Sequence, residues 1–152
     1  MTFSETPNIE FYLNNYTRGL DVINALQHIS YGGQVANLAA AITTATTMFT
    51  NPTFGARLGV NWVAVIVTDN PSASQPATLA AAAAMRAAGI SIITVGIGSS
   101  LNLYELSATC TYPPSANMFT VGTARNLSTL VTPVSTNLCS REFYVTLIFC
   151  IF

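Results

Sequence analysis

Hydrophobic side chains in this chain recur at two spacings, which alternate along the sequence. Over residues 35–49 they recur at helical spacing and form a single stripe, which predicts an amphipathic helix. Similar stripes predict helices over residues 18–29 and 127–138. An alanine-rich segment closed by Gly89 and a shorter segment before a proline pair predict further helices over residues 75–88 and 101–109.

Short apolar runs lie between these predicted helices and indicate buried strands. Residues 63–67 and 90–95 are rich in β-branched side chains, and residues 118–121 form a shorter run. Residues 9–13 alternate apolar with other side chains and predict a short edge strand. Because strands and helices alternate, we expect a Rossmann-like, doubly wound α/β fold: an open, mostly parallel sheet flanked by helices.

The chain has very few charges for its length. Charged residues make up 7% of 152 residues, the formal net charge is -1, and all five basic residues are arginines. A nucleic-acid partner is therefore excluded, because it needs a cationic patch that displaces counterions. The apolar share is 51%, but no apolar run approaches the roughly 20 residues that cross a bilayer, so no clear membrane span is expected.

The ends of the chain and its cysteines leave several questions open. No basic segment followed by an apolar core precedes residue 20, so no secretory signal peptide is recognisable. Residues 140–152 form an apolar tail that could be a shortened membrane anchor, a segment packed on a neighbour, or an artefact of gene prediction. Three cysteines cannot all pair within one chain. Asn15 and Asn126 match the N-glycosylation pattern.

Ligands of such sheets bind beyond the carboxyl ends of the strands, which here follow Val67, Val95 and Val121. The first of these positions holds Asp69, within Thr68-Asp69-Asn70-Pro71. A carboxylate there can coordinate a hard cation or orient a ligand. Equally, its side chain can cap the turn before Pro71. Position alone does not decide between the two.

Sequence patterns of enzymes are incomplete in this chain. Gly96-Ile97-Gly98 follows a strand as a dinucleotide fingerprint would, but Leu101 replaces the third glycine. A phosphate-binding loop needs a lysine, and the sequence has none. The single histidine, His28, has no acid in its own helical turns, and Glu105 is expected to be a solvated helix residue. We therefore expect no enzymatic activity.

The order and spacing of several short motifs resemble the von Willebrand factor type A domain, in its matrix-protein branch of collagen- and matrilin-like chains. The motifs are Phe3-Ser4, Ile29-Ser30-Tyr31-Gly32-Gly33, Gly55-Ala56-Arg57, residues 63–69 (Val-Ala-Val-Ile-Val-Thr-Asp), Ala87-Ala88-Gly89-Ile90, Val95-Gly96-Ile97-Gly98, Glu105-Leu106 and Leu138-Cys139. The resemblance implies a partial domain over residues 1–139 that lacks the family's first strand and helix. Without them, apolar strand edges would be exposed, which favours aggregation or pairing with another chain.

The resemblance also implies a site for a divalent cation, usually magnesium. Family members supply an Asp-x-Ser-x-Ser motif after the first strand, a threonine after the Gly-Gly turn and an aspartate in a Thr-Asp-Gly turn. In this chain the first motif is absent, Asn37 matches the threonine, and Asp69 matches the aspartate. Mg²⁺ binding is thus expected only if the missing first-strand motif exists upstream.

The resemblance identifies Cys139 with the family's closing cysteine, whose usual partner precedes the first strand. Cys139 is then either unpaired or bonded to Cys110, and Cys110 is equally well interpreted as a buried free thiol. For function, the resemblance implies an extracellular protein-binding or adhesion module that contacts a matrix or cell-surface protein, collagen-like or other. The alternatives are a metal-independent structural domain of a larger matrix or multidomain chain, and a non-functional gene fragment.

Overall fold

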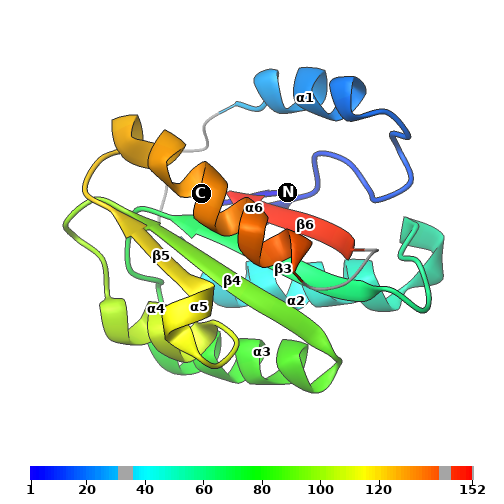
Figure 1. Ribbon diagram of the computed structural model, residues 1–152. Coiled ribbons are helices and arrows are strands. Elements are labelled where there is room, and N and C mark those ends of the chain that lie inside the picture. The colour runs from blue at the N-terminus through cyan, green and yellow to red at the C-terminus, as the bar shows by residue number, and fades with distance from the viewer. Residues whose placement is uncertain (31–35, 141–144, 152) are drawn as a thin grey trace.

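The computed structural model describes residues 1–30, 36–140 and 145–151, the last of these as backbone. Its described strands form one six-stranded sheet in the order β2-β1-β6-β3-β4-β5 (Figure 1). The strands are β1 (Thr2–Phe3), β2 (Pro7–Asn8), β3 (Asn61–Thr68), β4 (Ile90–Ile97), β5 (Met118–Val121) and β6 (Val145–Ile151). The helices are α1 (Gly19–Gln27), α2 (Leu38–Thr50), α3 (Gln75–Ala87), α4 (Leu103–Thr109), α5 (Pro114–Asn117) and α6 (Val131–Cys139), with 3₁₀ segments η1 (Pro52–Phe54) and η2 (Ala124–Leu130).

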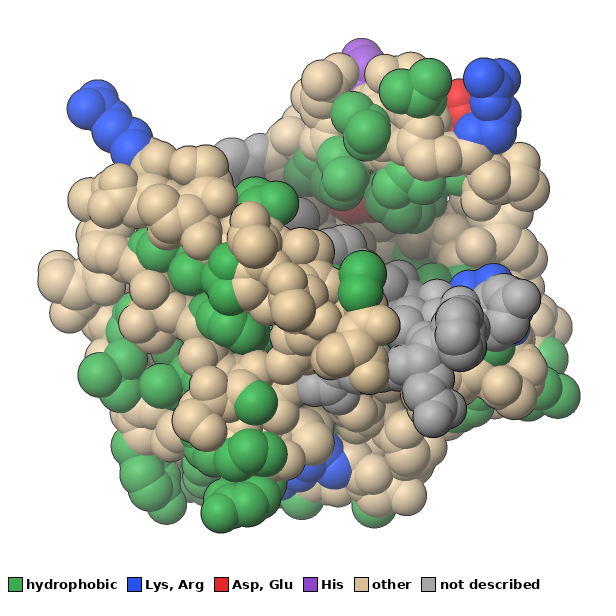
Figure 2. Space-filling view, viewed as in Figure 1, with side chains coloured by type: hydrophobic (Ala, Val, Ile, Leu, Met, Phe, Trp, Pro, Cys, Tyr) green, Lys and Arg blue, Asp and Glu red, His purple; other side chains and the backbone are tan. Residues whose placement is uncertain are grey.

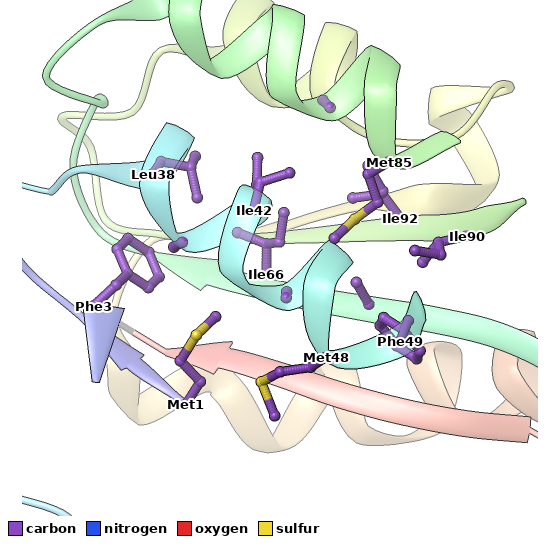
Figure 3. Close-up of a cluster of buried hydrophobic side chains, with 14 of the residues drawn as sticks. Met1, Phe3, Leu38, Ile42, Met48, Phe49, Ile66, Met85, Ile90 and Ile92 are labelled. Atoms are coloured by element: carbon purple, nitrogen blue, oxygen red, sulfur yellow. The ribbon is translucent and has the colours of Figure 1, made fainter. Parts of the chain in front are cut away.

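Side chains of β3 and β4 point alternately to two hydrophobic clusters, one on each face of the sheet. Ala64 and Ile66 of β3 pack under α2 and α3, together with Met1 and Phe3 from the N-terminal strand (Figure 3). Val63 and Val65 face the other way, toward apolar side chains of η2 and α6. This two-sided burial explains why both strands are continuous apolar runs in the sequence.

The expected doubly wound α/β architecture is confirmed. Strands β3, β4, β5 and β6 run parallel, and among the described strands only the short pair β1 and β2 is antiparallel. The strands predicted at residues 63–67, 90–95 and 118–121 correspond to β3, β4 and β5. Parallel strands place all their carboxyl ends at one edge of the sheet, which sets the position of the loops described below.

The strand predicted over residues 9–13 does not form. Ile9 and Leu13 instead pack against the hydrophobic core as part of an irregular segment. The backbone N–H of Leu13 donates to the carbonyl of Phe54, and Tyr12 stacks on the Phe54 ring at 4.7 Å. The alternation of side chains over residues 9–13 therefore reflects packing of one side of this segment on η1, and the segment pairs with no described strand.

The predicted helices are present, with different bounds and different packing. Helix α2 begins three residues later than expected, after its N-cap Asn37; Val35 and the Gly-Gly turn lie outside the described residues. The stripe over residues 127–138 is divided between η2 and α6. Pro133 has no backbone N–H, so it cannot donate the hydrogen bond that would join α6 to the preceding turn in one continuous α-helix. Helix α1 has no buried residue.

The apolar tail, whose role the sequence left open, supplies a central strand. Strand β6 lies between β1 and β3 and pairs in parallel with β3 from Asn61↔Val145 to Val67↔Ile151. On its other side it pairs with β1 at Thr2↔Ile151. The edge of β3 that we expected to be exposed, because the family's first strand is absent, is therefore covered by residues 145–151.

Candidate functional site

Four loops lie at the carboxyl edge of the sheet, and backbone hydrogen bonds join three of them to one another. The turn after β1 accepts a bond from the entry to α2, since the N–H of Asn37 donates to the carbonyl of Ser4 at 2.7 Å. The loop after β3 joins the same entry, because Ala73 N–H donates to Ala36 O at 2.9 Å. We call residues 4–6, 36–37, 69–74 and 98–104 the carboxyl-edge loops. They form the region where the fold predicts a ligand.

Asp69 is exposed in the loop after β3 and is not the residue that caps its turn. Thr68 has that role: its hydroxyl donates to the carbonyl of Asn70 at 3.0 Å and accepts the N–H of Asn70 at 3.4 Å. The carboxylate of Asp69 accepts one bond from the side-chain amide of Asn70 at 2.8 Å. Asp69 thus presents a solvent-facing carboxylate that is available to a partner.

Asn37, the second predicted site residue, caps a helix. Its Oδ1 accepts the backbone N–H of Ala40 at 3.1 Å, which satisfies one of the free donors at the start of α2. Its Nδ2 donates to the carbonyl of Glu5 at 3.2 Å. Both ends of the amide are therefore occupied by the protein's own backbone.

These two residues do not make a fitting magnesium site. Magnesium requires near-octahedral oxygen coordination and usually takes one or two carboxylates. Here the oxygen of Asn37 is used by Ala40, which leaves the carboxylate of Asp69 as the single family-matched ligand. Within the described part of the chain, no group of three or more His, Cys, Asp or Glu side chains is arranged to hold a metal ion.

Glu105 is buried, which corrects the expectation of a solvated helix residue. It lies in the first turn of α4, where Asn102 caps the helix by accepting the N–H of Glu105. Its carboxylate accepts two bonds from Ser72, one from the backbone N–H at 3.1 Å and one from the hydroxyl. Thr78 donates in turn to the Ser72 hydroxyl oxygen. Glu105 thus fixes the loop that carries Asp69 to the start of α4, a role that sequence reasoning missed.

The same first turn of α4 exposes two large side chains, Leu103 at 53% and Tyr104 at 67%. Figure 2 shows that charged side chains are sparse over the face it presents. Exposed aromatic side chains are enriched where proteins bind one another. The carboxyl-edge loops therefore combine an exposed carboxylate, Asp69, with an exposed aromatic ring, Tyr104, on two segments that Glu105 holds together.

The Gly96-Ile97-Gly98 motif serves packing and turn geometry. A side chain on Gly96 would come within 2.7 Å of Leu101 and 2.8 Å of Leu106. Gly98 adopts a φ of 102°, which favours glycine, and its N–H donates to the carbonyl of Val121. The motif is thus a tight strand-to-helix connection between β4 and α4.

The remaining predicted site residues lie apart from the carboxyl edge. Cys110 and Cys139 are both free thiols, so the possible bond between them is not formed; Cys110 is buried and Cys139 exposed. Burial raises the pKa of the Cys110 thiol. His28 is an exposed residue at the end of α1, and the glycosylation candidates Asn15 and Asn126 are both exposed.

A hollow of about 650 Å³ lies beside α1 (Figure 2). Its lining residues are Glu10, Phe11, Tyr16, Asp21, Asn24, Ala25 and His28. The carboxylate of Glu10 is already hydrogen-bonded by Thr2 and Asn8, and His28 bonds to the carbonyl of Asn24. Two of the polar side chains that line this hollow, Glu10 and His28, thus already have partners within the protein. Among the described residues, no helix is long and apolar enough to cross a membrane.

A family model and individual relatives of known sequence both match this chain, and they agree on the kind of domain it forms. The von Willebrand factor type A domain model matches residues 1–133. The human collagen alpha-6(VI) chain is 31% identical over 144 residues, covering 93% of this chain and 6% of the collagen chain. Bovine cochlin is 42% identical over 67 residues, covering 43% of this chain and 12% of cochlin. This chain thus spans a small part of its relatives.

Solved structures support the same fold. Proximal thread matrix protein 1 from the mussel byssus superimposes with a TM-score of 0.83 and 21% sequence identity, covering 90% of this chain and 35% of that chain.

Proposed function

Since the chain belongs to the von Willebrand factor type A domain family, we propose that it is a protein-binding module of an extracellular matrix or cell-surface assembly. Its partner is a matrix or cell-surface protein, collagen-like or other. This proposal is supported by the kinds of protein the chain is similar to, a collagen VI chain, cochlin and a byssal thread matrix protein. No step in this role breaks or forms a covalent bond.

The partner binds at the carboxyl-edge loops. The observation that carries this assignment is the combination of the exposed Asp69 carboxylate and the exposed Tyr104 ring. Glu105 and Ser72 hold the two segments in a fixed relation, so little conformational freedom is lost when a partner binds. A ring gives buried contact area, and a carboxylate gives directional bonds to a partner's basic side chain or amide.

Binding through this edge does not depend on a metal held by Asp69 and Asn37. The family's cation bridge needs more oxygen ligands than these two residues offer, because Asn37 is committed to capping α2. We therefore expect this chain to bind its partner without the bound cation that the family resemblance implies.

The test is binding of the folded chain to a panel of immobilised fibrillar collagen, collagen VI and fibronectin. We expect binding to at least one member that survives a chelator and is weakened about tenfold or more by Asp69→Ala or Tyr104→Ala. Tyr112→Ala is the matched control, because Tyr112 is 86% exposed and lies beyond the other end of α4. Loss of binding in chelator would contradict the metal-free mechanism, and equal loss with Tyr112→Ala would contradict the assigned edge.

A second candidate is a metal-independent structural domain that packs within a larger matrix or multidomain chain. It is favoured by the exposed apolar side chains of α1, where Leu20 and Ile23 are 63% and 52% exposed. Absence of binding to every member of the panel by a chain with a cooperative unfolding transition would favour this role over the first. A chain that shows no such transition would favour the third alternative, a non-functional gene fragment.

A further inference from the structure

Strand β6 connects two parts of the sheet that have no other strand-to-strand link among the described residues. On one side, β1 and β2 form a short antiparallel pair. On the other, β3, β4 and β5 form a parallel sheet. Strand β6 lies between them and pairs with both (Figure 1). Its backbone therefore completes the sheet.

Without β6 the fold would contain an open slot with two unpaired edges. The slot has a defined length and direction, since seven residues of β3, from Asn61 to Val67, pair with β6 in parallel. Its β3 side is strongly apolar, and Val63, Ala64, Val65 and Ile66 are at most 1% exposed. Unpaired backbone groups next to such side chains bind another strand readily.

The segment that fills the slot is suited to move as a unit. Residues 145–151 have the sequence Val-Thr-Leu-Ile-Phe-Cys-Ile, without charge, proline or glycine, which is a composition with high strand propensity. The segment follows every other described element, beyond α6, so its removal interrupts no other strand or helix.

We propose that the slot between β1 and β3 is a strand-acceptor site, and that a second copy of this chain fills it with its own residues 145–151. Every copy carries both the strand and the slot, and parallel pairing gives the same ladder of hydrogen bonds within one chain or between two. Reciprocal exchange satisfies both slots and produces a closed dimer. The balance between monomer and dimer depends on protein concentration during folding.

The first experiment refolds the full chain at two protein concentrations that differ by about a hundredfold and measures mass by light scattering. We expect monomer at the low concentration and dimer at the high one. In both species, hydrogen exchange should show residues 145–151 as protected as β3. A monomer at both concentrations, or rapid exchange of residues 145–151 in the dimer, would overturn the proposal.

Substitutions in β6 distinguish strand exchange from association through another surface. Ile148→Pro removes a backbone donor and breaks the strand, whereas Ile148→Val keeps it. We expect Ile148→Val to dimerise and Ile148→Pro not to. A dimer of Ile148→Pro would show that another surface associates.

Because Ile148→Pro can fail to fold alone, complementation supplies a second measurement. Val65→Pro interrupts β3, which pairs with β4 as well as with β6, and therefore spoils the slot; the sequence of residues 145–151 is unchanged, so this variant can still donate that strand to the intact slot of Ile148→Pro. Refolding the two variants together, one of them isotopically labelled, should give a soluble heterodimer that neither forms alone. Separate aggregates of the two variants would overturn strand donation between copies.

Discussion

Glu105 accepts two hydrogen bonds from Ser72, one from its backbone N–H at 3.1 Å and one from its hydroxyl. The residues are 33 positions apart, and their contact joins the loop after β3 to the first turn of α4. Glu105 is 3% exposed, so the carboxylate is satisfied mainly by these bonds. A buried carboxylate paired in this way is costly to disturb, because its donors would be left without an acceptor.

Replacing Glu105 should therefore destabilise the fold. We expect Glu105→Ala to lower the free energy of unfolding by about 3 kcal/mol, since two donors of Ser72 lose their acceptor. Glu105→Gln should cost less, because its amide retains one acceptor oxygen. Urea denaturation followed by circular dichroism measures both. Glu5→Ala is the control, since Glu5 is exposed, and an equal loss in that variant would show that the effect is not specific to the buried contact.

The capping role of Asn37 predicts a second stability effect. Asn37→Ala removes the acceptor for the N–H of Ala40 and should cost about 1 kcal/mol. Asn37→Ser retains an N-cap oxygen and should recover most of this loss. Thermal unfolding of the three chains provides the comparison. If the serine variant were as unstable as the alanine variant, the bond from Nδ2 to the carbonyl of Glu5 would be the important one.

The two described thiols should differ in reactivity. Cys139 is exposed, whereas Cys110 is buried and its pKa is raised by that burial. Because the thiolate is the reactive form, iodoacetamide should modify Cys139 first at neutral pH, and Cys110 should respond only as the pH rises above the ordinary thiol range. Peptide mapping by mass spectrometry measures each site. In denaturant the difference should disappear, and equal native rates would contradict the burial of Cys110.

Glycosylation tests whether the two candidate sites are accessible when the chain passes through a secretory pathway. Asn15 and Asn126 are exposed, and the side-chain oxygen of Asn15 accepts the N–H of Tyr12, which leaves its nitrogen to carry a glycan. When the chain is secreted from eukaryotic cells, we expect a mass shift at both sites that a glycosidase removes. Thr17→Ala and Ser128→Ala should each abolish one of the two shifts. An unshifted mass for the unsubstituted, secreted chain would contradict this expectation.

Local sequence pattern was sufficient to predict β3, β4 and β5 and the helices that cover them. Strands such as β3 are buried on both faces, so their signal is carried by their own side chains. The cap of α2 also has a local signal, because Asn37 lies near the start of the predicted helix, directly before Leu38, and asparagine is a preferred N-cap. The same residue matches a metal ligand of the family, and only the folded contacts show which of the two roles its amide performs.

Contacts between distant segments were not predictable in the same way. The sequence left the role of the apolar tail open, and nothing local shows that residues 145–151 form a strand that pairs with β3, 84 residues earlier. Likewise, Glu105 resembles an ordinary helix residue until Ser72 is brought against it by the fold. The irregular path of residues 9–13 has the same cause, because it depends on contacts with the distant Phe54, which stacks on Tyr12 and accepts the N–H of Leu13.

Gly96 provides the last prediction, because its neighbours leave no room for a side chain. A β-carbon there would lie 2.7 Å from Leu101 and 2.8 Å from Leu106, well inside the normal contact distance. We expect Gly96→Ala to lower the free energy of unfolding by about 2 kcal/mol, as overpacking of a core commonly does. Gly122→Ala is the matched control, since a β-carbon added at Gly122 would meet nothing within 4 Å, and it should stay within about 0.5 kcal/mol of the unsubstituted chain. Denaturant unfolding of both variants measures the difference. Equal stability of the two variants would contradict this prediction. It would mean that Leu101 and Leu106 can move aside at little cost in free energy.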